Sequence, residues 1–261
     1  MVTVENRILQ DVAAEVAARE VQVTFQDIKA TSRSSRLPGA RDIRSLFLSS
    51  GCNVVAAFDR FASDWSDHEN PVEFAQHLEE FGVAMFSYTV RRGQFAAAVR
   101  DINEIKAAVE LPLFLDDLIV DPYQIHEARV LGADALSLAV WAMDQHKLEA
   151  LLDRTESLGM TALVKVRNPD EATRAVEAGA SVVAVDVTGY QGPKTLPEAF
   201  AGVCERLPAE AVRLVLGGCW TPKELMAFAR HSADAVYVSH NPLAAIRSLV
   251  SAGMHPACPS R

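Results

Sequence analysis

Short apolar runs alternate with amphipathic helical patterns along most of the chain. The stretch Pro112–Val140 shows the repeating unit: an apolar run, Leu113–Leu115, ends at Asp116 and Asp117, an amphipathic helix follows, and a second apolar run completes it. Connections this short are typical of two parallel strands joined by a helix. Eight apolar runs of this kind occur, over Val54–Phe58, Ala84–Tyr88, Leu113–Leu115, Ala135–Val140, Ala162–Val166, Val182–Val187, Arg213–Leu216 and Ala235–Val238.

Glycine residues mark the joints between the helical patterns and the apolar runs that follow them. Four helical patterns end in this way, at Gly82, Gly132, Gly159 and Gly179. A glycine in this position takes up the left-handed turn that ends a helix, because it has no Cβ to clash. Eight strand–helix alternations, with strands that are apolar on both faces, predict an α/β fold with a single (βα)8 barrel.

The chain before the first strand has a different pattern. Glu5–Glu20 carries apolar side chains on one helical face, residues 30–40 are a polar link with glycine and proline, and Ile43–Leu48 is a short helix. A last helix is expected from Pro242 to Val250. We therefore expect three parts: an N-terminal helical extension packed on the barrel (1–48), the (βα)8 barrel (49–253) and a frayed tail (254–261).

Composition restricts the partners of this chain. A hydrophobic content of 49% and a mean hydropathy of +0.08 suit one large core, while the net charge of −9 argues against nucleic acid as a partner. No apolar run of about eighteen residues and no signal-peptide pattern occur, so we expect a cytoplasmic protein without membrane contact, a monomer or weak homodimer. The four cysteines lack CxxC spacing and are predicted to be free thiols: Cys52, Cys204, Cys219 and Cys258.

One segment carries a resemblance to a known family. Residues 118–138, LIVDPYQIHEARVLGADALSL, resemble the segment after the third strand of indole-3-glycerol-phosphate synthase, where the pattern reads roughly RKDFIVDPYQIYEARAAGADAILLI. Because the match is long and without gaps, the chain is identified as a member of this family. The resemblance implies a (βα)8 barrel with an N-terminal helical extension and a lyase activity related to tryptophan biosynthesis.

The chain departs from the family at the residues that the family uses for chemistry. The catalytic lysine of the third strand falls on Asp116, and a site lysine of the first strand falls on Asp59. Lys165 replaces a glutamate on the fifth strand, while Asp186 and Thr188 replace an asparagine and an arginine after the sixth. Three of the replacements are still charged, lysine to aspartate twice and glutamate to lysine once; since unpaired charges near a core are costly, we interpret the site as rebuilt.

Four ionisable residues are predicted to meet at one mouth and to carry the chemistry, because the C-terminal ends of barrel strands converge: Asp59, Asp116, Lys165 and Asp186. Asp116 and Lys165 are the predicted acid–base pair, with the charges of the family's pair exchanged. A Schiff-base role for Lys165 and a buried ion pair that only closes the mouth stay open. The three aspartates also suit a divalent metal ion, but we favour a charge network without metal or cofactor.

Seven residues are predicted to bind the substrate: Thr188, Arg91, Arg92, Gly217, Gly218, Ser239 and His240. The two glycines and the Ser-His pair offer backbone amides to an anion near a helix start. The two arginines follow the second strand, where they would bind a carboxylate or phosphate from above the mouth. Two alternatives stay open: solvated loop arginines, and a histidine that only caps the last helix. An aspartate and a threonine replace the family's phosphate-contacting lysine and arginine, so a phosphorylated substrate is disfavoured.

These residues predict a family-type barrel enzyme with a rebuilt site. We expect a carbon–carbon lyase, decarboxylase or isomerase that acts on a small anionic or aromatic metabolite. Two alternatives remain: a non-catalytic relative that binds a metabolite or a partner enzyme, and indole-3-glycerol-phosphate synthase itself. Because one well-placed acid contributes about 10²–10⁴ in rate, loss of the third-strand lysine predicts little synthesis of indole-glycerol phosphate.

Overall fold

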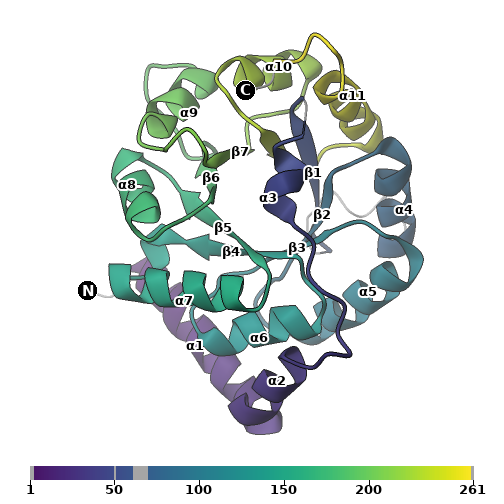
Figure 1. The fold of residues 1–261 in the computed structure, drawn as a ribbon, viewed down its shortest axis with the longest axis vertical. Coiled ribbons are helices and arrows are strands. Elements are labelled where there is room, and N and C mark those ends of the chain that lie inside the picture. The colour runs from purple at the N-terminus through teal and green to yellow at the C-terminus, as the bar shows by residue number, and fades with distance from the viewer. Residues whose placement is uncertain (1–2, 50, 61–69, 260–261) are drawn as a thin grey trace.

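A closed barrel of parallel strands forms the centre of the molecule (Figure 1). The structure, a computed structural model, describes residues 3–49, 51–60 and 70–259. Within these residues each of eight strands pairs with the next in sequence, and the eighth pairs with the first. The strands are β1 (Asn53–Phe58), β2 (Met85–Thr89), β3 (Leu113–Asp116), β4 (Ala135–Ala139), β5 (Thr161–Val166), β6 (Val182–Asp186), β7 (Val212–Leu216) and β8 (Ala235–Val238). The predicted (βα)8 barrel is therefore confirmed, with strand ends that differ by at most one residue.

Helices surround the barrel on its outer side (Figure 1). They are α4 (Pro71–Phe81), α5 (Phe95–Ala108), α6 (Pro122–Val130), α7 (Gln145–Ser157), α8 (Pro169–Glu177), α9 (Leu196–Cys204), α10 (Pro222–Arg230) and α11 (Leu243–Gly253), with a short 3-10 turn, Val140–Ala142, after β4. The four glycines predicted to end helices all have positive φ, between 75° and 89°. Each therefore takes the left-handed turn that the sequence predicted.

Alternate residues of each strand point into the barrel, where they form a separate apolar cluster. Val55, Phe114 and Leu163 belong to this cluster, and each has no exposed surface. The short helix α3 (Ile43–Phe47) contributes two fully buried side chains to the same cluster. Since the carbonyl of Phe47 accepts a hydrogen bond from the side chain of Asn53 at the start of β1, α3 closes the N-terminal end of the barrel. The opposite end, where the strands finish, is left for the site.

Three expectations at the ends of the chain need correction. The extension contains a second helix, α2 (Phe25–Ser32), after α1 (Val4–Gln22), and it occupies part of the predicted link. Pro242 precedes the last helix as its N-cap and does not lie in its first turn. Residues 254–259 are not frayed, because Cys258 is buried in the core and its N–H donates to the carbonyl of His255 at 2.7 Å. Residues 260 and 261 lie outside the described part.

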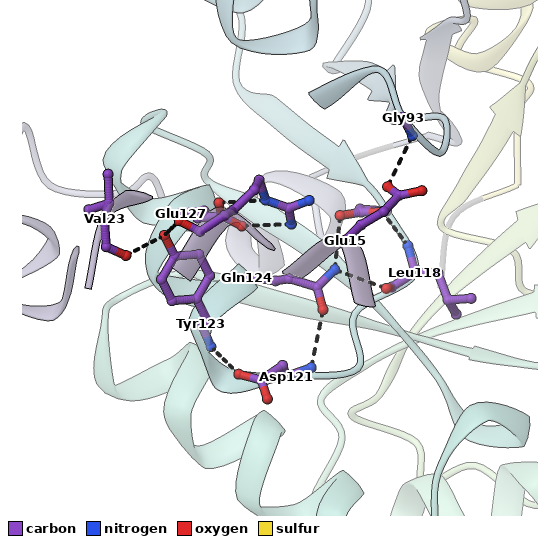
Figure 2. Close-up of polar contacts among 10 residues, drawn as sticks. Glu15, Val23, Gly93, Leu118, Asp121, Tyr123, Gln124 and Glu127 are labelled. Atoms are coloured by element: carbon purple, nitrogen blue, oxygen red, sulfur yellow. Dashed lines mark hydrogen bonds and ion pairs between the residues drawn. The ribbon is translucent and has the colours of Figure 1, made fainter. Parts of the chain in front are cut away.

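The N-terminal extension is fixed to α6 by polar contacts (Figure 2). Arg19 of α1 donates from two nitrogens to the carboxylate of Glu127, at 2.8 and 2.9 Å. The hydroxyl of Tyr123 donates to the carbonyl of Val23 at 2.9 Å. The carboxylate of Glu15 accepts from the N–H of Gly93 at 3.0 Å, in the loop after β2. The extension therefore contacts both a barrel helix and a loop of the mouth.

Candidate active site

Lys165 and Asp116 meet inside the barrel mouth. Asp116 is the last residue of β3, and Lys165 is the last but one of β5. Each lies two residues beyond an inward-pointing residue, Phe114 or Leu163, so its side chain also points inward. Lys165 Nζ donates to Asp116 Oδ1 at 2.5 Å, and the two side chains are 24% and 15% exposed. The predicted contact between them is confirmed; their catalytic roles stay predictions.

Polar residues of the strand interiors, which the sequence analysis missed, complete the surroundings of Asp116. Ser137 Oγ of β4 donates to Oδ1 at 3.1 Å, and Tyr237 OH of β8 donates to Oδ2 at 3.0 Å. Ser87 Oγ of β2 donates in turn to Tyr237 OH at 3.4 Å. Burial, and then the charge of Asp116, hold the pKa of Tyr237 well above its ordinary value. The sequence did contain a signal for these three residues, because each is a polar residue at an inward-pointing position of an otherwise apolar strand.

Asp59 and Arg91 form an ion pair with each other. The guanidinium donates to both carboxylate oxygens, with distances of 2.5 to 3.0 Å, and the Asp59 side chain is 9% exposed. The Arg91 side chain is 48% exposed, and it lines the smaller cavity beside α1. Arg92 instead pairs with Asp11 of α1. Neither arginine is only solvated, and the charge of Asp59 is neutralised by a partner.

Asp186 belongs to a third, separate set of contacts. Its Oδ1 accepts from the N–H and the hydroxyl of Thr188, at 2.9 and 2.6 Å. Lys165 has Asp116 as its ion-pair partner, so the expected single network divides into three sets. In the part of the chain that the structure describes, no group of three His, Cys, Asp or Glu side chains is placed to hold a metal ion. The three-aspartate metal alternative therefore has no support in the geometry.

The loops after β7 and β8 contain the predicted anion-binding residues. Gly217 and Gly218 both have positive φ, 80° and 68°, and a Cβ on Gly217 would lie 2.2 Å from Thr188 Cγ2. His240 also has a positive φ, 61°, which is uncommon for a residue with a side chain. Ser239 directly follows β8, whereas the last helix starts only at Leu243. Both loops thus turn sharply at the mouth, but the helix start is more distant than expected.

Asp117, adjacent to Asp116 in sequence, points away from the mouth toward the N-terminal extension. Its carboxylate accepts from the N–H of Leu118 at 2.8 Å and from Gln124 Nε2 at 3.1 Å. Gln124 is fixed because its Oε1 accepts from the N–H of Asp121 in the capping box of α6 (Figure 2). Burial raises the pKa of Asp117, although both hydrogen bonds and Arg19 oppose this. The two neighbouring carboxylates therefore face different parts of the molecule: Asp116 faces the mouth, and Asp117 faces the N-terminal extension.

Two cavities lie beside loops that follow the C-terminal ends of the strands. A cavity of about 580 Å³ lies along the loop after β6 and helix α9, and it is lined by Asp186, Thr188, Tyr190 and Lys194 among others. A smaller cavity of about 160 Å³ lies between α1 and the loops after β2 and β3. The larger volume is in the range of sites for small molecules. Asp186 and Thr188 line the larger cavity, whereas neither Lys165 nor Asp116 belongs to the lining of either one.

A closed parallel barrel with ionisable side chains at the C-terminal ends of its strands defines the class of (βα)8-barrel enzymes. The family whose sequence model matches residues 5–244 is described as Indole-3-glycerol phosphate synthase. The chain therefore belongs to the indole-3-glycerol phosphate synthase family, which is a family of lyases. No described helix is both long enough and apolar enough to span a membrane.

Relatives of almost the same length support this assignment. A protein of Mycolicibacterium vanbaalenii named indole-3-glycerol phosphate synthase is 38% identical, with 98% of this chain and 97% of the relative covered. Proteins of the same name from Saccharopolyspora erythraea and Mycobacterium ulcerans are 38% and 39% identical, again over 98% of this chain and 98% and 97% of the relatives. These names support the synthase alternative more directly than a different reaction.

Solved structures show likeness in fold only. Orotidine 5'-phosphate decarboxylase from Pyrococcus horikoshii matches with a TM-score of 0.61 at 15% identity, over 77% of this chain and 99% of that chain. Thiamine phosphate pyrophosphorylase from Pyrococcus furiosus matches with a TM-score of 0.58 at 14% identity, over 82% and 100%. At this identity the likeness confirms the barrel and carries no argument about the reaction.

Proposed function

We propose that this chain is a carbon–carbon lyase or isomerase of the indole-3-glycerol phosphate synthase family, in which Lys165 and Asp116 form the acid–base pair. Its substrate is a small anionic or aromatic metabolite. The observation that carries the proposal is the ion pair between these two side chains inside the mouth, at 2.5 Å. A proton donor and an acceptor held together at the mouth suit proton transfer during bond cleavage or rearrangement.

The charges around the mouth favour a substrate whose binding requires less positive charge from the protein than the binding of a phosphate does. Asp59 is matched by Arg91, so the pair presents little net charge. Asp186 adds a carboxylate at the edge of the larger cavity. Asp186 would repel a phosphate dianion more strongly than a carboxylate, because the dianion carries more negative charge, and it would not repel an aromatic ring in this way.

The second candidate is indole-3-glycerol phosphate synthase itself. The names of relatives at 38% identity over nearly the whole chain favour it. In that case Lys165 supplies from β5 the proton that the family supplies from its third strand, and the exchanged pair performs the same reaction with reversed positions. We also infer a cytoplasmic protein, which four free and buried cysteines support.

Complementation of a tryptophan auxotroph, together with assay of the purified protein for indole-3-glycerol phosphate, separates the two candidates. Our proposal expects no complementation, whereas growth without tryptophan would establish the synthase alternative. A thermal-shift screen of small carboxylates and aromatic metabolites then identifies substrates, because a ligand at 100 times its Kd adds roughly 2.7 kcal/mol of stability.

Substitution of Lys165 tests the assignment of the pair with any substrate that is found. Lys165→Met should reduce kcat by at least about 10²-fold. Lys106→Met is a matched control, because the Lys106 ammonium donates to the carbonyl of Gly132 outside the mouth. Ligand binding without turnover, and unchanged binding by Lys165→Met, would instead establish a non-catalytic relative.

A further inference from the structure

Asp116 receives hydrogen bonds from three other strands of the barrel. Lys165 of β5 and Ser137 of β4 both donate to Oδ1, at 2.5 and 3.1 Å. Tyr237 of β8 donates to Oδ2 at 3.0 Å, from the opposite side of the barrel interior. Both carboxylate oxygens therefore have at least one donor, and the side chain is held from two sides.

The Tyr237 hydroxyl has two hydroxyl neighbours, Ser87 and Thr89, and one carboxylate neighbour, Asp116. Its ring is buried and packs edge-on against Phe114, with ring centroids 6.1 Å apart and an angle of 81°. Ser87 Oγ donates to the Tyr237 oxygen at 3.4 Å, and a tyrosine hydroxyl has one hydrogen of its own to give. That hydrogen is directed to Asp116, whose carboxylate accepts.

Apolar packing does not explain why a serine stands at position 137. It is buried in β4 between Leu136 and Leu138, and the family pattern quoted above has leucine at its position. Its hydroxyl contacts Asp116 Oδ1 and the carbonyl of Asp117, the latter at 2.7 Å. A buried hydroxyl without partners is costly, and the single hydrogen of Ser137 is shared between the carbonyl of Asp117, the shorter contact, and the carboxylate of Asp116.

We propose that Tyr237 and Ser137 are positioning residues, which hold Asp116 so that it orients the Lys165 ammonium toward the substrate. This inference rests on the proposed function and adds to it the direction of proton transfer. Asp116 acts as the oriented counter-ion, and Lys165 is the proton donor. In that step the Nζ–H bond breaks, the proton passes to a substrate atom that gains negative charge, and the neutral amine takes up a proton from solvent. Lys165 contacts the substrate; Tyr237 and Ser137 act through Asp116.

Removal of one hydroxyl tests the role of Tyr237. Tyr237→Phe should lower kcat about tenfold or more and change KM by less than about threefold, because an interaction that acts on the transition state alone is lost. Tyr88→Phe is the matched control: the Tyr88 hydroxyl is also buried and donates to a carboxylate, Asp101 at 2.6 Å, but on the outer side of the barrel. Wild-type kcat in Tyr237→Phe, or a loss no larger than in Tyr88→Phe, would overturn the inference.

A second experiment needs no substrate. Tyr237 and Lys165 touch Asp116 on different oxygens, so any coupling between them passes through that carboxylate. Denaturant unfolding of Tyr237→Phe, Lys165→Met and the double variant should show non-additivity of at least about threefold in the unfolding equilibrium constant. The combination of Tyr88→Phe with Lys165→Met should be additive.

The two experiments distinguish the two proposals. Additive unfolding effects for Tyr237 and Lys165 would overturn the positioning role, even where Lys165→Met abolishes turnover and the proposed function stands. Strong coupling together with full turnover by Lys165→Met would overturn the proposed function, because the pair would then be held for stability alone. Coupling, a fall in kcat in Tyr237→Phe and loss of turnover in Lys165→Met are the expected results.

Discussion

Single residues decide which charges the mouth presents. Lys165 and Asp116 are both partly shielded from water, where the attraction between them is stronger than on an open surface. Removing one partner leaves the charge of the other shielded from water and unpaired, whereas removing both partners leaves no unpaired charge. The pair should therefore behave as a unit in stability as well as in turnover.

A double-mutant cycle tests this coupling. Lys165→Met alone should destabilise the protein by about 1–3 kcal/mol, because the Asp116 carboxylate loses its cation. Asp116→Asn combined with Lys165→Met should recover part of this loss without recovering activity. Denaturant unfolding measures the four free energies of unfolding.

A matched control for the cycle is the exposed pair of Arg92 and Asp11, whose side chains are 54% and 48% exposed. Exposed pairs contribute about 0–1 kcal/mol, so the corresponding cycle should give a small coupling. Coupling within about 0.5 kcal/mol of zero for Lys165 and Asp116 would mean that the two side chains do not interact.

Among the elements, α6 shows how the N-terminal extension stabilises the barrel. Most residues of this helix are buried, including polar ones such as Gln124, His126 and Glu127, because α1 and α2 cover its outer face. A barrel helix normally leaves one face to solvent, so polar residues are common there. Here His126 and Glu127 have partners in the extension, Ser32 and Arg19. Gln124 instead has its partners in the loop before α6.

Arg19 is the partner for Glu127, and its removal tests the docking of α1. The Glu127 side chain is 7% exposed and burial raises its pKa, an effect that Arg19 opposes. Arg19→Met should therefore destabilise the protein by about 2–4 kcal/mol and make α1 more sensitive to limited proteolysis. Arg44→Met, which removes a partly exposed arginine whose side chain donates to the backbone carbonyl of Glu210, should cost less than about 1 kcal/mol. Equal effects of the two substitutions would contradict a docking role for Arg19.

His126 makes the contact between α2 and α6 sensitive to pH. It is fully buried, its Nδ1 lies 2.7 Å from Ser32 Oγ, and burial together with Arg154, Arg33 and Lys29 lowers its pKa to about 4. The unfolded chain takes up a proton near pH 6.5, but the folded protein does so only near pH 4. The contribution of His126 to the free energy of unfolding is therefore fully present above about pH 6.5. It is lost as the pH falls toward 4, and the loss amounts to about 1–3 kcal/mol.

Urea unfolding between pH 4 and pH 7 measures this loss. His126→Gln should flatten the dependence of the unfolding free energy on pH over this range, because glutamine does not titrate. His146→Gln, which replaces an exposed histidine of α7, should keep the dependence of the parent protein. The same slope in both variants would show that His126 does not titrate as proposed.

At the scale of the whole molecule, a close backbone contact joins the start of the first strand to the end of the last helix. The N–H of Cys52, just before β1, donates to the carbonyl of Gly253 at the end of α11, at 3.1 Å. A Cβ on Gly253 would lie 2.1 Å from the carbonyl oxygen of Cys52. Only glycine allows the two backbones to approach so closely.

Gly253→Ala should therefore destabilise the protein by about 2–4 kcal/mol, since backbone must move to admit the methyl group. Gly39→Ala is the matched control, because no atom lies within 4 Å of the added Cβ and the φ of Gly39 is not positive. That variant should be neutral or more stable by up to about 1 kcal/mol. Thermal and urea unfolding compare the two, and equal stabilities would contradict the close contact.

The sequence by itself determined the barrel, the helix ends and the ion pair of Lys165 with Asp116. Alternation of apolar runs with amphipathic helices is a local signal, and each glycine at a helix end acts within its own turn. Parallel strands bring their C-terminal ends to one mouth, so residues after different strands can be placed together without a structure. Free cysteines were also predicted correctly, from the absence of CxxC spacing and of a secretory pattern.

Only the tertiary structure decided which charges share partners. Tyr237 meets Asp116 across 121 positions of sequence, through the interior of a closed barrel, and no local pattern encodes that approach. In the same way Arg91 neutralises Asp59, Asp186 is held apart with Thr188, and Arg19 reaches Glu127 from the extension. The stagger of the strands and the packing of the extension set these distances, because contacts between side chains depend on the position of the whole backbone.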